Sequence, residues 1–138
     1  RKMSYPFVPG VENYIKSLKS NGIRTAVVTS SNLLKMENVY RCHPGFREMF
    51  DIILTSEDFS ESKPSPYCYL KAMRLFGAGP EDCVVFEDSL AGLQAARASG
   101  AFVTALTTTN PEEVVRNYAD LVIRDFNDSG IGANGLPH

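Results

Sequence analysis

The sequence has no apolar run long enough to cross a lipid bilayer. Its longest runs, such as those at 26–28 and 83–86, are a few residues long, whereas a spanning helix needs about 20. The first ten residues, RKMSYPFVPG, have neither the apolar core nor the cleavage site of a secretory signal. The sequence also has little excess of charge of either sign, because 14 basic and 16 acidic residues leave a net charge of −2. We therefore expect neither a membrane nor a nucleic acid as a partner.

Cysteine and histidine are few, with three of the first and two of the second. Cys42, Cys68 and Cys83 share no CxxC spacing, and an odd number cannot all pair within the chain. Cys83 opens an apolar segment, where a buried reduced thiol is expected. His43 lies in a turn and His138 ends the chain, so neither has the serine or cysteine partner of a catalytic triad, and the pattern is a poor one for zinc. These features favour a reducing cytoplasm.

The 138 residues, 43% hydrophobic and 22% charged, suit one globular domain. Apolar segments expected to form strands are IRTAVVT, FDIILT, CVVFE, AFVTAL and LVI. Segments with helical periodicity alternate with them: VENYIKSLKS, LLKMENVYR, YCYLKAMRLF and SLAGLQAARAS, then a short helix from Asn110-Pro111. Strands this continuously apolar are typical of a parallel sheet that helices cover on both faces. The sequence predicts an α/β fold, a three-layer Rossmann-like parallel sheet, over residues 1–126, with a flexible glycine-containing tail at 127–138.

Polar residues follow three of the expected strands. Thr29-Ser30-Ser31 follow AVV, Lys63 lies in the loop after IIL, and Glu87-Asp88-Ser89 follow VVF. The carboxyl ends of parallel strands meet at one edge of a sheet, and ligands bind there. We therefore expect these residues to lie close together.

Each of these segments has a structural and a functional interpretation. Thr29 and Ser30 offer a hydroxyl and amide groups suited to a phosphate oxygen, or they only begin a helix. Lys63 offers a charge to the same anion, or it is an ordinary exposed lysine. Glu87 and Asp88 suit Mg²⁺, which prefers carboxylate oxygens, or Asp88 or Ser89 starts the following helix as its cap and Glu87 is exposed. Tyrosines at helical spacing, such as Tyr69, are expected to pack in the core.

Taken in order, AVVTSS, SKPSPYCYLKA and VVFEDSLAGLQAARASG resemble motifs II, III and IV of the haloacid dehalogenase superfamily of phosphatases and phosphomutases. The similarity covers about residues 6–126, and PFVPGVENYIKSLKSNG resembles the segment that re-enters the core domain after a helical cap. The EDS form of the last motif is similar to β-phosphoglucomutase and related sugar-phosphate phosphatases.

The resemblance implies a role for each of the polar residues. Thr29 and the Ser30 amide would bind the transferring phosphoryl group, and Lys63 would neutralise it. Asp88 would bind Mg²⁺, with Glu87 a ligand or a close neighbour of one. The implied activity is that of an Mg²⁺-dependent phosphatase or phosphomutase acting through an aspartyl-phosphate on a small phosphorylated metabolite, with a sugar phosphate as the expected class.

The family's first motif, an apolar strand ending in D-x-D that supplies the nucleophile, does not occur in the sequence. Asp125 and Asp128 have the wrong spacing. The resemblance implies that this strand and the cap would lie before Arg1, that the sheet is incomplete without the strand, and that the chain alone is inactive. The alternative is a non-catalytic α/β module with a vestigial phosphate site.

In the family the missing strand lies between the strand ending at Thr29 and the one ending at Glu87. Unpaired strand edges are costly when buried and adhesive when exposed. We therefore expect the gap to be filled by the missing N-terminal piece, by a neighbouring chain, or by direct pairing of the two flanking strands.

Overall fold

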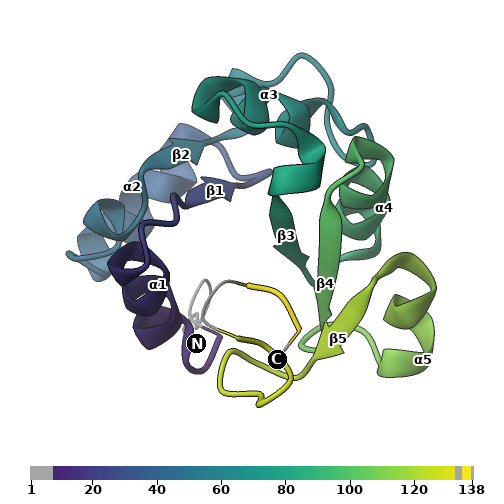
Figure 1. Cartoon of the computed structure of the whole chain (residues 1–138). Helices are drawn as coiled ribbons and strands as arrows, with labels where there is room; N and C mark the ends of the chain where they lie inside the picture. The colour runs from purple at the N-terminus through teal and green to yellow at the C-terminus, as the bar shows by residue number, and fades with distance from the viewer. Residues whose placement is uncertain (1–7, 133–134, 138) are drawn as a thin grey trace.

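The computed structural model describes residues 8–132 and 135–137, in which strands and helices alternate (Figure 1). The strands are β1 (Ala26–Val28), β2 (Ile52–Leu54), β3 (Val84–Glu87), β4 (Phe102–Leu106) and β5 (Leu121–Ile123). The α-helices are α1 (Val11–Ser20), α2 (Leu33–Cys42), α3 (Tyr67–Phe76), α4 (Leu90–Ser99) and α5 (Glu112–Val115). Short 3₁₀ turns lie at η1 (Arg47–Met49), η2 (Ser56–Asp58), η3 (Pro80–Asp82) and η4 (Arg116–Tyr118).

The three strand pairs that the structure describes are parallel, so the predicted α/β class is confirmed. β1 pairs with β2, and β4 lies between β3 and β5. Within each group, consecutive strands along the chain are connected through helices, as parallel strands require.

The helices begin and end where the sequence chemistry predicts. Asn32 caps α2 by accepting a hydrogen bond from the Lys35 amide at 2.9 Å. Gly77 and Gly100 end α3 and α4 with φ angles of 70° and 89°, a left-handed conformation that costs glycine little.

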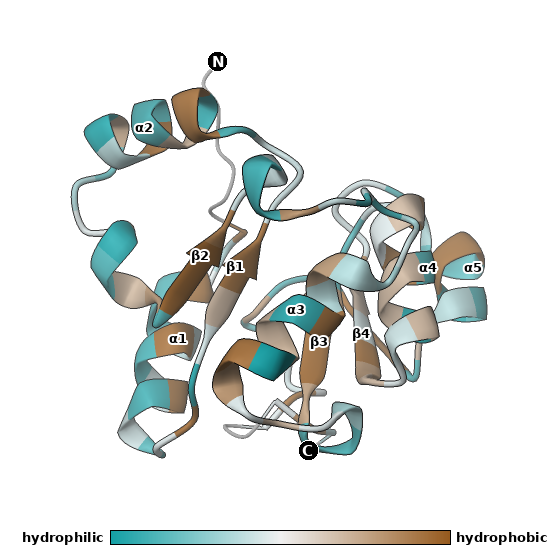
Figure 2. Ribbon diagram, turned by 90° about the horizontal axis from the view of Figure 1, so that it is seen from above, coloured by the Kyte–Doolittle hydropathy of each residue, from teal (hydrophilic) through white to brown (hydrophobic). Residues whose placement is uncertain are grey.

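Helices cover both faces of the strands, which confirms the three layers. Leu93 of α4 and Val103 of β4 are fully buried in the core beneath α3 and α4. On the opposite face, Tyr14 of α1 packs on Phe86 of β3, with the ring centroids 5.8 Å apart, in a cluster that also holds the buried Ile123 of β5. Met36 of α2 lies in a third cluster against β1 and β2. Figure 2 shows the apolar strands β1 and β2 standing apart from β3, with α3 between the two groups in that view.

A cavity of 560 Å³ lies between the two groups of strands. Residues of β1, β3, α1 and α3 line it, most of them apolar. Among the strands that the structure describes, β1 pairs only with β2 and β3 only with β4. Direct pairing of β1 with β3, one of the three expected ways of filling the gap, is therefore wrong. Side chains of α1 and α3 line the space between these two strands.

The described part of the C-terminal segment contacts the core. Ile131 is 7% exposed, and the Tyr14 hydroxyl donates to the Gly132 carbonyl at 2.7 Å. The division of the chain at residue 126, with a flexible tail after it, stays a prediction.

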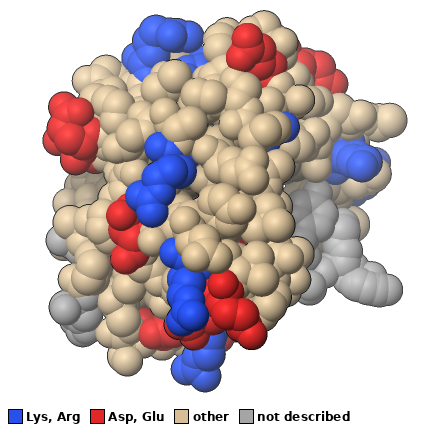
Figure 3. Space-filling model, turned by 90° about the vertical axis from the view of Figure 1, so that its right-hand side faces the viewer, with Lys and Arg blue, Asp and Glu red and all other residues tan. Residues whose placement is uncertain are grey.

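Acidic and basic side chains are interspersed on the face that Figure 3 shows. In the described part of the chain, no helix combines the length and the apolar character needed to cross a membrane.

Candidate functional site

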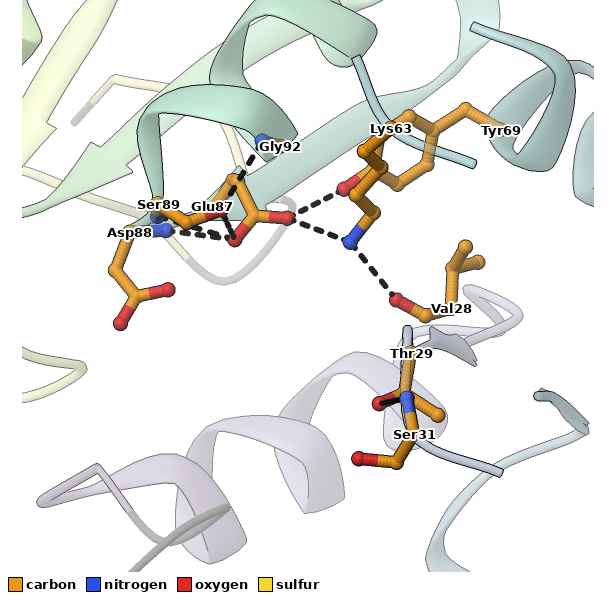
Figure 4. A network of polar contacts seen from close by, with 9 residues as sticks. All are labelled: Val28, Thr29, Ser31, Lys63, Tyr69, Glu87, Asp88, Ser89 and Gly92. Carbon is orange, nitrogen blue, oxygen red and sulfur yellow. Dashed lines mark hydrogen bonds and ion pairs between the residues drawn. The ribbon is translucent and has the colours of Figure 1, made fainter. Parts of the chain in front are cut away.

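The loop before α3 connects the carboxyl ends of the two separated groups of strands. Lys63, in this loop, donates a hydrogen bond from Nζ to the Val28 carbonyl at the end of β1, at 3.2 Å. The same Nζ lies 2.9 Å from Oε2 of Glu87, the last residue of β3 (Figure 4). One ammonium group therefore joins the two strand ends, and the residues that follow these ends in the chain are Thr29 and Asp88.

Glu87 has both carboxylate oxygens engaged by the protein. Oε2 accepts from Lys63 and, at 2.6 Å, from the Tyr69 hydroxyl. Oε1 accepts from the amides of Asp88 and Ser89 at 3.0 and 3.3 Å, and from the Ser89 hydroxyl at 3.3 Å. The geometry therefore suits Glu87 to holding Lys63 better than to binding a cation directly.

The electrostatics of this cluster follow from its burial. The side chains of Lys63 and Glu87 are only 12% and 11% exposed, so water screens their attraction weakly. Burial alone would raise the pKa of Glu87, but the Lys63 ammonium and the hydrogen bond from Tyr69 outweigh it and hold that pKa below its usual range. Burial, and then the neighbouring Glu87 carboxylate, raise the pKa of Tyr69. Glu87 is therefore an anion and Tyr69 a neutral donor at neutral pH.

Gly92 in the first turn of α4 makes room for the Glu87 side chain. A Cβ atom at this position would lie 2.1 Å from Oε2 of Glu87. The Gly92 amide also donates to the Ser89 hydroxyl at 3.0 Å, so Ser89 caps α4. The cap is thus Ser89, one of the two residues expected for it, and not Asp88, whereas the exposed Glu87 of the same interpretation is wrong because its side chain is only 11% exposed.

At the end of β1, Thr29 and Ser30 form an open turn. The Thr29 hydroxyl accepts from the Ser31 amide at 3.0 Å and can still donate to a ligand. Ser30 is exposed, and within the described residues its amide has no acceptor. The first turn of α2 is already occupied by an anion, because the Glu57 carboxylate accepts from the Leu33 amide at 3.0 and 3.2 Å. A phosphate would therefore meet Thr29 and Ser30 and not the helix terminus itself.

Asp88 has a different environment from Glu87. Its side chain points away from Lys63 and Tyr69 (Figure 4). Oδ2 accepts from the hydroxyls of Thr108 and Thr109, in the loop after β4. No donor to Oδ1 is found in the part of the chain that the structure describes.

The described residues can supply only some of the ligands that a divalent cation needs. Within residues 8–132 and 135–137, no three His, Cys, Asp or Glu side chains gather closely enough to hold a metal ion. Asp88 has an uncommitted carboxylate oxygen of the kind that Mg²⁺ binds, so this residue fits the role of one ligand. Glu87 fits the role of its neighbour, and the other ligands would have to come from water, substrate or another part of the protein.

Several residues of this site were not found by sequence reasoning. Tyr69 was expected only to pack against other residues, and Glu57 belongs to none of the motifs found in the sequence. A third group follows β4 at the same edge of the sheet: Thr108, Thr109 and Asn110. This position after a strand could have identified them from the sequence.

A family model for haloacid dehalogenase-like hydrolases matches residues 2–100. The protein CbbY of Cereibacter sphaeroides is 42% identical over 133 residues, which cover 93% of this chain and 56% of CbbY. The bifunctional riboflavin kinase/FMN phosphatase of Arabidopsis thaliana is 33% identical over 130 residues, 94% of this chain and 34% of that protein. A crystal structure of a mutant CbbY from Rhodobacter sphaeroides in complex with xylulose-(1,5)-bisphosphate superposes with a TM-score of 0.80 at 34% identity, covering 94% of this chain and 58% of that one. The chain thus spans little more than half the length of CbbY.

Proposed function

Because the chain belongs to the haloacid dehalogenase-like hydrolases, we propose that the full-length protein is an Mg²⁺-dependent phosphatase or phosphomutase of the β-phosphoglucomutase type. Its substrate would be a small phosphorylated metabolite, with a sugar phosphate as the expected class. The observation that carries this proposal is the position of Lys63, which bridges the ends of β1 and β3, the strands that Thr29 and Asp88 directly follow. The xylulose bisphosphate bound to the related CbbY supports the substrate class.

The proposal assigns each polar group a part in handling a phosphoryl group. The Thr29 hydroxyl and the Ser30 amide would donate to its oxygens, and the Lys63 ammonium would neutralise its charge. Glu87 would keep Lys63 in place, since the pair is largely desolvated. Asp88 would hold the Mg²⁺ ion, which supplies further positive charge next to the phosphoryl oxygens.

The nucleophile must come from elsewhere, because these 138 residues contain no D-x-D sequence. We propose that a carboxylate from another part of the full-length protein attacks phosphorus and forms an aspartyl-phosphate. The bond from phosphorus to the ester oxygen breaks, and the alcohol leaves with a proton from a general acid that this other part would also supply. The strand that carries it would enter the 560 Å³ cavity and pair with β1 and β3. A backbone added there would satisfy the facing edges of both strands. An N-terminal piece of the same protein is the expected source, and a neighbouring chain could supply the same strand.

Activity assays on the full-length protein test this function. With p-nitrophenyl phosphate or sugar phosphates and Mg²⁺, Lys63→Met and Asp88→Asn should each lower kcat/KM by about 10²–10³-fold, as the loss of one charge-stabilising group does. Lys35→Met, which removes an exposed lysine of α2, is the matched control and should leave turnover unchanged. Residues 1–138 alone should show no turnover.

Three results would count against the proposal. Turnover by the full-length protein that survives Asp88→Asn would exclude Asp88 from the site. Turnover by residues 1–138 that disappears in Asp88→Ala would reveal a nucleophile within this chain. A full-length protein that binds phosphate without hydrolysing any ester would favour the non-catalytic module.

We also propose a reducing compartment such as the cytoplasm. The cysteines Cys42, Cys68 and Cys83 are free in the structure. Alkylation of freshly isolated protein should modify all three after unfolding without reductant. A disulfide recovered in that experiment would refute this assignment.

A further inference from the structure

The loop that follows β4 makes three hydrogen bonds to Asp88. β4 pairs with β3 so that Ala105 lies opposite Glu87, and the next residues of β4 therefore pass beside Asp88. The hydroxyls of Thr109 and Thr108 donate to Oδ2 of Asp88 at 2.5 and 3.2 Å. The Asn110 side-chain amide donates to the Asp88 carbonyl at 3.2 Å.

These three hydrogen bonds define the orientation of the Asp88 carboxylate. Both hydroxyls use the same oxygen, Oδ2, while Oδ1 receives no donor from the described residues. The hydrogen bond from Asn110 restrains the main chain of Asp88 itself. The loop therefore leaves one oxygen of Asp88 available to a ligand and uses the other to hold the side chain still.

No other described group holds the Asp88 side chain in this way. Glu87 is held by Lys63, Tyr69 and Ser89, whereas the Asp88 carboxylate is directed away from them (Figure 4). Thr108 and Thr109 are exposed, so their bonds to Asp88 contribute little to the folded state. A carboxylate that is free to rotate loses that freedom when it binds a cation, and holding it beforehand removes this cost.

We propose that Thr109, assisted by Thr108, is a positioning residue that orients Asp88 for the binding of a divalent cation. This inference rests on the proposed function and adds a contribution from the loop after β4. Neither threonine touches the phosphoryl group in this proposal, and their effect passes through Asp88 alone.

Calorimetric titration of the full-length protein with Mg²⁺, without substrate, tests the inference. Thr109→Val keeps the shape of the side chain and removes the hydroxyl. It should weaken Mg²⁺ binding about 10-fold, the lower end of the effect of groups that orient metal ligands. Thr109→Ser restores the hydroxyl and should bind within about twofold of the wild type. Thr107→Val is the control, because Thr107 is the neighbouring residue and its hydroxyl makes no hydrogen bond to Asp88.

Activity supplies a second measurement that a merely structural role would not reproduce. In Thr109→Val, the Mg²⁺ concentration for half-maximal turnover should rise about 10-fold, as the affinity predicts. The rate at saturating Mg²⁺ should return to that of the wild type, and the melting temperature should not change.

The possible outcomes separate the inference from the proposed function. If Asp88→Asn abolishes Mg²⁺ binding while Thr109→Val binds as the wild type does, the positioning role is refuted and the function stands. If Thr109→Val, Thr109→Ser and Thr107→Val weaken binding equally, the effect is structural and the inference fails. If the wild type does not bind Mg²⁺, or Asp88→Asn binds it equally well, both the inference and the Mg²⁺-dependent function are refuted.

Discussion

The hydrogen bond from Tyr69 to Glu87 offers a quantitative test of how the site is held together. Tyr69 is 6% exposed, and its hydroxyl lies 2.6 Å from Oε2 of Glu87. Tyr69→Phe removes the hydroxyl and keeps the ring, which packs in the core with α4. The substitution therefore isolates one short bond to a buried carboxylate.

The expected magnitude follows from what remains around Oε2. A hydrogen bond to a charged group contributes about 1.5–3 kcal/mol. Lys63 still contacts the same oxygen at 2.9 Å, so Glu87 is not left without a partner. We therefore expect Tyr69→Phe to lower the free energy of unfolding by about 1.5–2 kcal/mol at neutral pH.

The pH dependence has a definite sign. A carboxyl whose folded pKa is depressed adds stability above its unfolded pKa, and this stability is lost as the pH falls through the folded pKa. Tyr69 helps to lower the pKa of Glu87, so Tyr69→Phe raises that pKa toward its usual value of 4.5. The difference in stability between the variant and the wild type should thus be largest near neutral pH and shrink in acid.

Urea unfolding at several pH values between about 7 and 4 measures both quantities. Tyr40→Phe is the control, because Tyr40 packs on Phe46 and its hydroxyl makes no hydrogen bond within the described part of the chain. Equal stabilities for Tyr69→Phe and Tyr40→Phe at neutral pH, or a difference that grows in acid, would refute the reasoning.

Three further predictions concern stability. Gly92→Ala places a methyl group 2.1 Å from Glu87 Oε2, so it should lower the free energy of unfolding in urea by about 1–3 kcal/mol, although alanine has the higher helix propensity. Gly45→Ala, where nothing lies within 4 Å of the added carbon, should leave this free energy unchanged. Equal effects of the two substitutions would contradict the packing argument. Leu93→Ala removes a fully buried side chain of α4 and should cost about 2–5 kcal/mol by calorimetry, whereas Leu75→Ala, 54% exposed, should stay within about 0.5 kcal/mol. The wild type should lose stability below about pH 4.5, because the depressed pKa of Glu87 makes it take up a proton when it unfolds in acid. Glu87→Gln should remove part of this loss. If the melting temperature of the variant falls with pH as steeply as that of the wild type, the pKa of Glu87 is not depressed.

The local features of the fold could be predicted from the sequence. Asn32 begins a helix through a side-chain cap, and Gly100 ends one through a left-handed turn. Both effects involve only neighbouring residues, so they can be predicted from the sequence. The continuous apolar strands predicted a parallel sheet, and the carboxyl ends of such strands lie at one edge whatever the details of packing. The EDS segment indicated the family for the same reason, because its acids and small residues are neighbours in the chain.

The chemical role of each acid was decided only by the tertiary structure. The two adjacent carboxylates look alike in the sequence, yet Glu87 meets Tyr69 and Lys63 while Asp88 meets Thr109, contacts that span 18, 24 and 21 residues. Tyr69 has the spacing of a core residue, and its ring is one. Whether its hydroxyl also reaches a carboxylate depends on how closely α3 and the end of β3 approach, which is set by packing distributed over the whole core. The sequence by itself placed acids at the end of a strand, and the packing of the helices and loops around them decided which acid holds Lys63 and which keeps an oxygen free.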